Sequence, residues 1–233
     1  MDDRKLRQGF RGLHGGLMEK SKRSFTAAIF DMDGLILDSE RTVLKCWEVI
    51  GEKYGFPDIV TYGISVIGKN KRSTVEEFER VYGEPGDRYE AELRQIYNGM
   101  EVPLKPHTIE LLSAMKNAGM KIAIASSSTR EEVISQLTKL GAFKFFDAAV
   151  CGDQVTKSKP DPEIFLLACD ALGVKPEESI GLEDSFNGVR ACKASGLYTI
   201  MVPDIIQPDD EMKGLADVIL PSLKDVQDFL NLK

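Results

Sequence analysis

From Thr108 to the C-terminus, the sequence repeats one pattern: an amphipathic stretch with helical spacing, a glycine, and then a short apolar run. Glycine commonly follows the last turn of a helix, because it adopts the left-handed conformation without strain. Short apolar runs are typical of parallel strands that are buried on both faces. The pattern therefore predicts an α/β fold, a Rossmann-like parallel sheet flanked by helices. We expect helices at 108–118, 130–140, 162–172 and 186–195, strands at 121–126, 147–152, 179–184, 198–202 and 217–220, and a terminal helix.

An earlier apolar run, FTAAIF at 25–30, stops directly at Asp31 and predicts the first strand of the same sheet. The segment that follows has helical periodicity and no clear strand. A helical insertion at this point would cover the carboxyl ends of the strands, where open α/β sheets bind their ligands. We therefore expect a core domain at 25–38 and 104–233, an inserted helical cap domain at 39–103, and a basic, glycine-rich, disordered leader at 1–24.

The composition excludes several classes of partner. The chain has 30 Lys and Arg against 37 Asp and Glu, a net charge of −7, which repels a phosphate backbone and predicts no nucleic-acid partner. No apolar stretch approaches the roughly 18 residues of a membrane span, so we expect no membrane partner. The four cysteines are widely spaced and form no CxxC pair, which favours a reducing cytoplasm. A cytoplasmic monomer is the expectation.

Acidic pairs follow two of the expected strands. Asp31 and Asp33 come directly after the first strand, and Glu183 and Asp184 come at the end of a later one. Carboxylates held together in this way repel one another unless they share a proton or a cation, and hard oxygen ligands suit Mg²⁺. The alternative is a solvated acidic loop. The two histidines, His14 and His107, have no surroundings suited to a catalytic triad or a zinc site.

Hydroxyl side chains gather at 126–129, after another expected strand and before a helix. Thr129 and Glu132 have the spacing of a capping box. Ser128 and Glu131 have the same spacing. The free backbone N–H groups and hydroxyls at such a helix start can bind an anion, although a simple N-cap explains the pattern as well.

Lys159 lies in the sequence KSKPDP, between an expected strand and an expected helix. Asp161 as the N-cap and Pro162 as the first helical residue explain the end of this segment. They do not explain the lysine, which could neutralise a phosphate or an acyl-phosphate oxygen at the sheet edge. A solvated lysine is the alternative.

Taken together and in this order, DMDGLILDSE, SSS, KSKPDPEIF and GLEDSFNGVRACKASG resemble the four motifs of the haloacid dehalogenase-like hydrolase superfamily. The resemblance runs from Phe25 to the C-terminus. It is strongest to the branch with a helical cap after the first motif, which contains β-phosphoglucomutase-like proteins and many sugar-phosphate phosphatases. It implies a phosphatase that hydrolyses a small phosphorylated metabolite, a sugar phosphate, through an aspartyl-phosphate intermediate.

The resemblance also implies a role for each motif residue. Asp31 would be the nucleophile, and Asp33 the general acid and then the general base. Ser126 would hydrogen-bond the transferring phosphoryl group, and Lys159 would offset its charge. Mg²⁺ would be held by a carboxylate oxygen of Asp31, the backbone carbonyl of Asp33 and the carboxylate of Asp184, with Glu183 in the outer sphere. Ser127 would bind the substrate, together with Lys71 and Arg72 of a basic cap loop at 68–72.

Two residues bear on the choice of reaction. Dehalogenases of this superfamily lack an aspartate two residues after the nucleophile, so Asp33 favours phosphoryl transfer. β-Phosphoglucomutases carry a histidine in the segment after the first motif, where this chain has Val43. A phosphatase is therefore the leading hypothesis, and a β-phosphoglucomutase-type hexose phosphomutase is the alternative. A phosphate-responsive regulatory module that retains the site is a third hypothesis, from a different class.

Overall fold

The computed structural model describes residues 24–67 and 71–233. Its centre is a parallel six-stranded sheet with the order β3-β2-β1-β4-β5-β6, so the predicted α/β fold is confirmed. Residues 1–23, where a disordered leader was expected, lie outside the described residues. The strands are β1 (Ala27–Phe30), β2 (Lys121–Ser126), β3 (Ala148–Cys151), β4 (Ser179–Glu183), β5 (Tyr198–Met201) and β6 (Val218–Ile219).

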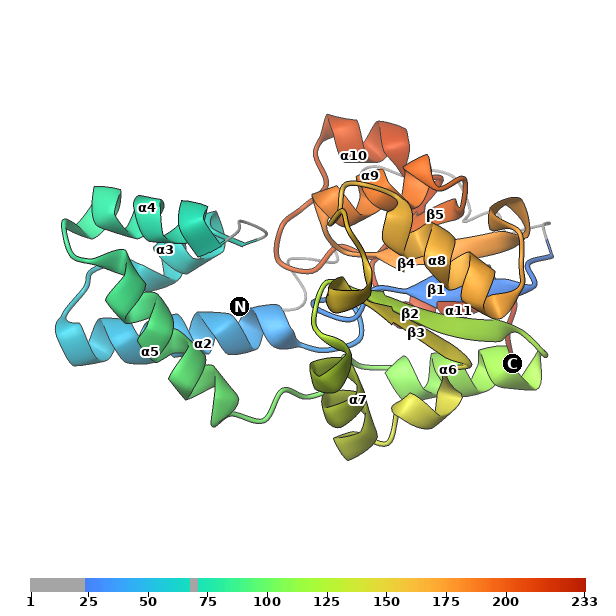
Figure 1. Ribbon diagram of the computed structural model, residues 1–233, viewed down its shortest axis with the longest axis horizontal. Helices are drawn as coiled ribbons and strands as arrows, with labels where there is room; N and C mark the ends of the chain where they lie inside the picture. The colour runs from blue at the N-terminus through green and yellow to red at the C-terminus, as the bar shows by residue number, and fades with distance from the viewer. Residues whose placement is uncertain (1–23, 68–70) are drawn as a thin grey trace.

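Helices cover both faces of the sheet because each strand alternates its side chains between them. Ala28 and Phe30 of β1 pack toward the cluster that contains α6, α7 and α11. Ala27 and Ile29 pack toward α8 and α9. Figure 1 shows the resulting three layers. These helices are α6 (Thr108–Asn117), α7 (Arg130–Lys139), α8 (Glu163–Leu172), α9 (Phe186–Ala194), α10 (Asp210–Leu215) and α11 (Leu223–Phe229), and short 3-10 turns occupy Phe143–Phe145, Gly152–Gln154 and Pro176–Glu178.

The inserted segment forms a separate helical cap, to the left of the sheet in Figure 1. Its helices are α2 (Ser39–Tyr54), α3 (Ile59–Ser65), α4 (Lys71–Tyr82) and α5 (Gly86–Asn98). They pack around aromatic rings, with Phe78 at the centre and only 1% exposed. Its ring centroid is 5.7 Å from that of Trp47 and 4.9 Å from that of Tyr89. The cap therefore has a hydrophobic core of its own.

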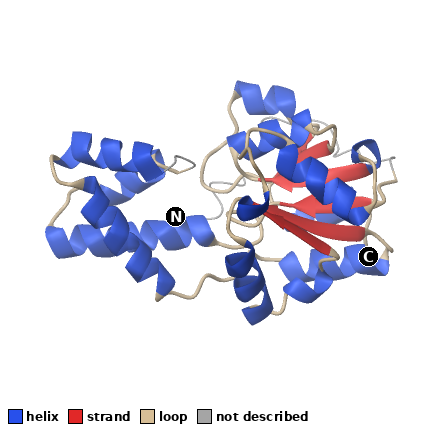
Figure 2. Cartoon of the chain, viewed as in Figure 1, coloured by secondary structure: helices blue, strands red, loops and turns tan. Residues whose placement is uncertain are grey.

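The chain crosses between core and cap at two adjacent points. An isolated antiparallel bridge pairs Leu37 with Leu104. The Asp38 N–H donates to the Pro103 carbonyl at 2.9 Å, and the Lys105 N–H donates to the Ile36 carbonyl at 2.7 Å. These bonds hold the outgoing and returning segments together. Figure 2 shows that the strands run with their carboxyl ends toward the cap, so both crossings lie at that edge of the sheet.

Several sequence predictions differ from the structure at element boundaries. Lys71 and Arg72 were expected in a loop, but they begin helix α4. Helix α8 begins at Glu163 rather than at Pro162, and Pro162 occupies the N-cap. Asp161 still serves the helix start, since its Oδ1 accepts the Glu163 N–H at 3.1 Å.

Helices α3 and α10 were not predicted. The sequence of α3, IVTYGIS, is rich in β-branched residues and contains a glycine, so its helix propensity is low. Packing decides its conformation, because a Cβ on Gly63 would lie 2.8 Å from Leu44 and 3.0 Å from Trp47, both on α2. Helix α10 is short and is capped by Asp209, whose Oδ1 accepts the Met212 N–H at 2.9 Å.

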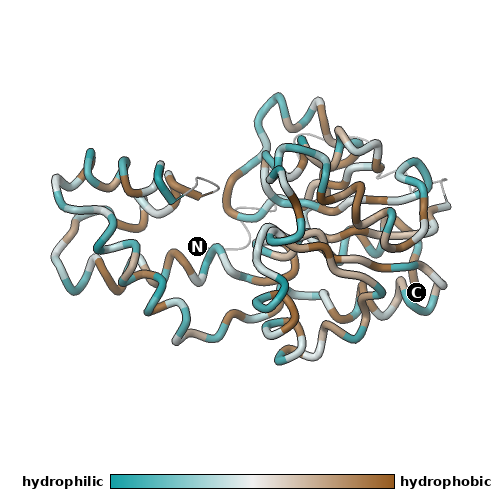
Figure 3. Tube along the Cα trace, viewed as in Figure 1, coloured by the Kyte–Doolittle hydropathy of each residue, from teal (hydrophilic) through white to brown (hydrophobic). Residues whose placement is uncertain are grey.

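Hydrophobic segments run through the part of Figure 3 where the sheet lies, and the residues of β1 are all buried. All four cysteines are buried and unpaired. Within residues 24–67 and 71–233, none of the helices has the length and hydrophobicity needed to cross a membrane.

Candidate active site

The predicted site residues converge because β1, β2 and β4 are neighbours at the centre of the sheet. Asp31 follows β1, Ser126 ends β2 and Glu183 ends β4. The Asp31 N–H donates to the Leu182 carbonyl at 3.0 Å, which keeps Asp31 in register with β4. Since parallel strands finish at one edge, these side chains share a single location below the cap.

Lys159 is buried in this cluster, so the solvated-lysine alternative is wrong. Its side chain is 7% exposed, and its Nζ donates to Asp31 Oδ1 at 2.5 Å and to Glu183 Oε1 at 2.6 Å. A third bond, of 2.9 Å, goes to the Ala125 carbonyl. Burial lowers the pKa of Lys159, but the two carboxylates outweigh it and raise the pKa above its usual value. The lysine is therefore a fixed positive charge beside Asp31.

The preceding loop places Lys159 by means of one carboxylate. Glu163, at the start of α8, accepts hydrogen bonds from the Thr156 N–H and hydroxyl and from the Lys157 N–H, at 2.8–3.0 Å. The loop is thus tied back to the helix that follows it, and the lysine between them is directed to the sheet edge.

Glu183 is completely buried, and both of its oxygens are occupied. Oε1 accepts from Lys159, and Oε2 accepts from the N–H groups of Asp184 and Ser185 and from the Ser185 hydroxyl, at 3.0–3.2 Å. These donors belong to the start of α9, where a helix favours negative charge. Gly188 leaves the space, since a Cβ there would lie 1.9 Å from the Glu183 carboxylate. Glu183 is therefore fixed as a partner of the lysine.

Asp184 has spare capacity for a cation. Its Oδ1 is buried, and no described residue donates a hydrogen bond to it. Burial raises the pKa of Asp184 well above its usual value, and the charges of Glu183 and Asp31 raise it further. Asp31, Glu183 and Asp184 each offer an oxygen within 4.8 Å of the others. Gly34 allows this approach, because a Cβ there would lie 2.1 Å from Asp184 Oδ2. The donor set fits a hard divalent cation.

Asp31 and Asp33 differ in their surroundings. Burial raises the pKa of Asp31 to about 8, with Lys159 acting in the opposite direction and Glu183 adding to the rise. Burial also raises the pKa of Asp33, against a hydrogen bond of 2.9 Å from the Ser128 hydroxyl to Asp33 Oδ2. The side chain of Ser39, the first residue of α2, also lowers the pKa of Asp33.

The capping box at the start of α7 is formed by Thr129 and Glu132. Ser128 is therefore not a cap and contacts Asp33 instead, a role that sequence spacing did not indicate. Ser126 is fully buried, and its hydroxyl oxygen accepts the Ser128 N–H at 3.1 Å, so its proton can be donated elsewhere. Ser127 is exposed and lines a cavity of about 230 Å³ that Lys159 also borders.

The cap residues proposed for substrate binding lie apart from this cluster. Lys71 Nζ is 3.5 Å from Glu90 Oε2, and Arg72 Nε donates to Glu76 Oε1 at 2.8 Å. Figure 1 shows the first turn of α4 on the side of the cap that faces the core. Val43 packs against the aromatic core of the cap.

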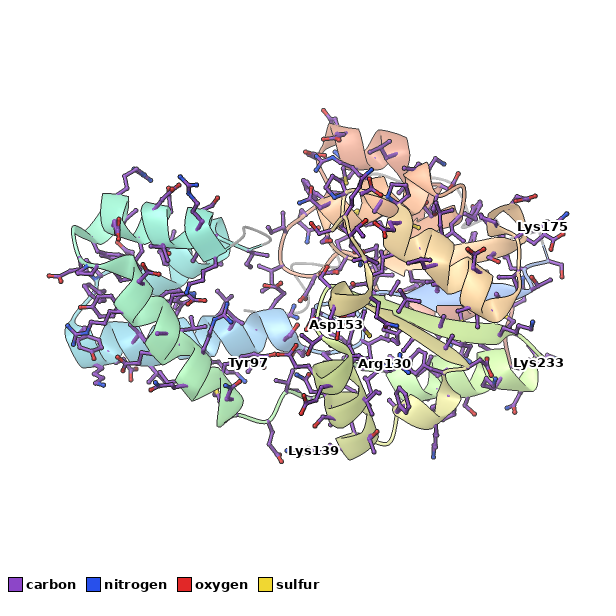
Figure 4. The ribbon with its side chains drawn as sticks, viewed as in Figure 1. Tyr97, Arg130, Lys139, Asp153, Lys175 and Lys233 are labelled. Carbon is purple, nitrogen blue, oxygen red and sulfur yellow. The ribbon has the colours of Figure 1, made fainter. Side chains whose placement is uncertain are left out.

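Two further interactions were not predicted. Tyr97 lies on the last turn of α5, and burial raises the pKa of its phenol, with a further rise from the charge of Asp33. Arg130 and Asp153 lie close together in Figure 4, and the Arg130 N–H donates to Asp153 Oδ1 at 3.1 Å. Their bond joins the start of α7 to the turn after β3. Neither interaction has a periodic or motif signal in the sequence.

The chain is similar to known proteins over most of its length. The sequence model of the haloacid dehalogenase-like hydrolases matches residues 28–202. A phosphorylated carbohydrates phosphatase from Thermotoga maritima is 30% identical over 219 residues, covering 88% of this chain and 97% of that protein. Hexitol phosphatase B from Escherichia coli is 32% identical over 220 residues, covering 88% and 95%. A solved structure from Thermotoga maritima, described as a β-phosphoglucomutase, has a TM-score of 0.71 at 27% identity and covers 88% and 96%. The four motifs, their meeting at one sheet edge and these matches agree that the chain is an enzyme of the haloacid dehalogenase-like hydrolase family.

Proposed function

We propose that this enzyme is a Mg²⁺-dependent phosphatase that hydrolyses a small phosphorylated metabolite, a sugar phosphate, through an aspartyl-phosphate intermediate. The observation that carries the proposal is the buried Lys159, whose ammonium joins Asp31 to Glu183. A fixed cation beside a buried carboxylate is what an acyl-phosphate intermediate requires, since it offsets the charge of the incoming phosphoryl group.

The reaction would proceed in two displacements. A carboxylate oxygen of Asp31 attacks phosphorus, the bond to the sugar oxygen breaks, and Asp33 donates a proton to that oxygen. Asp33 then accepts a proton from water as the water oxygen attacks the acyl phosphate, which releases phosphate and restores Asp31. Burial favours the protonated form of Asp33 that the first step needs, and the Ser128 hydrogen bond favours the ionised form that the second step needs.

Ser126 and Lys159 would hold the transferring group. The Ser126 hydroxyl can donate to a phosphoryl oxygen, because its own oxygen already accepts from the Ser128 N–H. Lys159 supplies the positive charge at the attacking side. Ser127, which is exposed at the adjacent cavity, would contact the substrate phosphate.

Asp31, Asp184 and the backbone carbonyl of Asp33 would hold Mg²⁺, with Glu183 in the outer sphere. Once bound, the ion would neutralise carboxylate and phosphoryl charge. The spare oxygen of Asp184 supports this assignment, as does the full set of hydrogen bonds on Glu183.

The cap would select the substrate. Arg72 is exposed and pairs with the exposed Glu76 at the surface of the cap, where ion pairs contribute little to stability. Lys71 is also exposed, and its partner Glu90 is largely buried. A distal anionic group could therefore displace those partners. The relatives that act on phosphorylated carbohydrates and hexitols support a sugar or polyol phosphate.

A hexose phosphomutase is the second candidate, favoured by the likeness to a structure described as a β-phosphoglucomutase. A mutase must exclude water from the aspartyl phosphate while its intermediate reorients, which requires tight coupling of cap closure to Asp33. The apolar Val43 is packed into the cap core and offers no polar link of that kind.

One assay separates these functions. The enzyme is given β-glucose 1-phosphate, catalytic glucose 1,6-bisphosphate and Mg²⁺, and free phosphate and glucose 6-phosphate are measured together, with a panel of other sugar phosphates in parallel. We expect phosphate to form faster than glucose 6-phosphate. If glucose 6-phosphate forms about tenfold faster, the mutase replaces the phosphatase. If p-nitrophenyl phosphate with Mg²⁺ yields no phosphate above an EDTA control, the enzymatic proposal fails and a regulatory module takes its place.

A further inference from the structure

Charged side chains gather where the chain crosses between core and cap. Asp204 follows β5 in the segment that leads to α10, and its Oδ1 contacts both Arg41 Nη1 and Lys105 Nζ, the latter at 2.5 Å. The same two cations contact Asp38 Oδ1, at 2.9 Å and 3.1 Å. Arg41 belongs to the first turn of α2 and Lys105 to the returning segment. Asp204 therefore joins both chain crossings to the segment of the core that follows β5.

The Asp204–Lys105 pair of this cluster is more buried than the ion pairs within the cap, whereas Arg41 is 44% exposed. The Asp204 side chain is 5% exposed and the Lys105 side chain 13%, whereas Arg80 and Glu77, paired within α4, are 69% and 23% exposed. Charges shielded from water and salt attract one another more strongly. The Asp204 contacts thus link the start of α2 and the returning segment to the core through one buried carboxylate.

The first turn of α2 also contacts the turn at Asp33 and Gly34, which we call the catalytic turn. The Ser39 oxygen accepts the Gly34 N–H at 2.9 Å, next to Asp33, and the Ser39 side chain lowers the pKa of the Asp33 carboxyl. Arg41 lies two residues further along the same turn. A displacement of this turn would therefore change the position of the Asp33 carboxylate.

We propose that Asp204 is a positioning residue for the reaction described above: through Arg41 and Lys105, it holds the first turn of α2 against the catalytic turn at Asp33 and Gly34. Asp204 touches no reacting atom, and its effect passes through Arg41 to Ser39. The inference rests on the proposed phosphatase function. Misplacing an acid–base group by about 1 Å can cost about a hundredfold in rate, so a contact outside the site can be visible in turnover.

The test compares Asp204→Asn, Arg41→Gln and the double variant by turnover of p-nitrophenyl phosphate with saturating Mg²⁺. We expect kcat to fall about 10-fold to 100-fold in each single variant, with KM changed by less than about twofold. The double variant should be no slower than the slower single variant, because both substitutions break one link. Asp204→Glu, which retains the charge, should recover part of the loss.

Matched controls exclude a general effect of charge removal. Asp210→Asn removes a fully exposed carboxylate close to Asp204 in sequence, and Arg80→Gln removes a surface ion pair of the cap. Both should keep the wild-type kcat. Arg41 is 44% exposed, so Arg41→Gln should remain folded even if Asp204→Asn does not, and melting curves check both.

Hydrogen–deuterium exchange gives a readout independent of activity. Amides in the first turns of α2 should exchange several-fold faster in Asp204→Asn and Arg41→Gln than in wild type, and at the wild-type rate in both controls. The proposal is overturned if Arg41→Gln retains wild-type kcat and exchange, or if the losses in the double variant multiply. If the wild type shows no phosphatase activity, the proposed function fails, and exchange alone decides whether Asp204 holds α2.

Discussion

Replacing Asp184 with asparagine should change the stability of the enzyme in opposite directions with and without Mg²⁺. Asparagine keeps the shape of the side chain and removes its charge. In the metal-free protein, Asp184 is partly buried beside Glu183 and Asp31, and its buried Oδ1 lacks a hydrogen-bond partner among the described residues. Because the pKa of Asp184 is raised on folding, its ionised form at neutral pH destabilises the folded state.

The magnitude follows from the charge on the unsatisfied oxygen, which asparagine removes while it keeps a polar atom at the same position. A buried polar group without a partner costs about 1–3 kcal/mol, and more when it is charged. For a protein of this size, 1 kcal/mol corresponds to roughly 2–4 °C in Tm. We therefore expect Asp184→Asn to melt about 4–8 °C above the wild type in EDTA. Mg²⁺ at a hundred times its Kd should stabilise the wild type by about 2.7 kcal/mol, and the variant much less.

Differential scanning fluorimetry with increasing Mg²⁺, at fixed ionic strength, measures both effects. The wild-type Tm should rise with Mg²⁺ and approach or pass that of the variant, which should stay nearly constant. Asp210→Asn, whose side chain is fully exposed, serves as the matched control and should follow the wild type. The reasoning is refuted if Asp184→Asn melts below the wild type in EDTA, or if its Mg²⁺ midpoint equals that of the wild type.

Three further outcomes are expected. Asp31→Asn should lose phosphate release by several orders of magnitude while its circular dichroism and Tm stay near wild type, and turnover within about tenfold of wild type would contradict a nucleophilic Asp31. The pKa of Asp31 is raised to about 8, and Mg²⁺ binds the ionised carboxylate, so protons compete with Mg²⁺ below that pH. The Mg²⁺ affinity measured by calorimetry should therefore fall about tenfold or more from pH 7 to pH 6. Equal affinities at the two pH values would argue against Asp31 as a ligand. Gly188→Ala would place a Cβ 1.9 Å from the Glu183 carboxylate, which its hydrogen bonds hold in place. The free energy of unfolding, measured with urea, should therefore fall by about 1–3 kcal/mol, together with a lower kcat. Wild-type stability would mean that Glu183 can move aside freely.

The sequence by itself determined the layers of the fold and the chemistry of the sheet edge. Apolar runs that stop at Asp31 and Glu183 indicate buried parallel strands, and the ends of such strands share one edge whatever the loops do. The four motifs then predicted which acids, hydroxyl and lysine would meet there. These inferences depend on local patterning, which the chain carries directly in its order of residues.

Tertiary structure decided everything that depends on distant neighbours. Whether Lys159 is solvated or buried depends on Asp31 and Glu183, which lie far from it in the chain. Ser128 could have capped α7, and only the position of Asp33 shows that it does not. Helix α3 forms despite its poor propensity because Gly63 lets it pack closely on α2.

The link between Asp204 and Arg41 is the clearest case. No spacing or motif connects these two residues, since one follows the fifth strand and the other begins the cap. They meet because the two chain crossings lie at the carboxyl edge of the sheet, where the segment after β5 also emerges. Local propensity acts over a few residues, whereas burial of opposite charges is determined by the packing of the whole chain, so such contacts appear only in three dimensions.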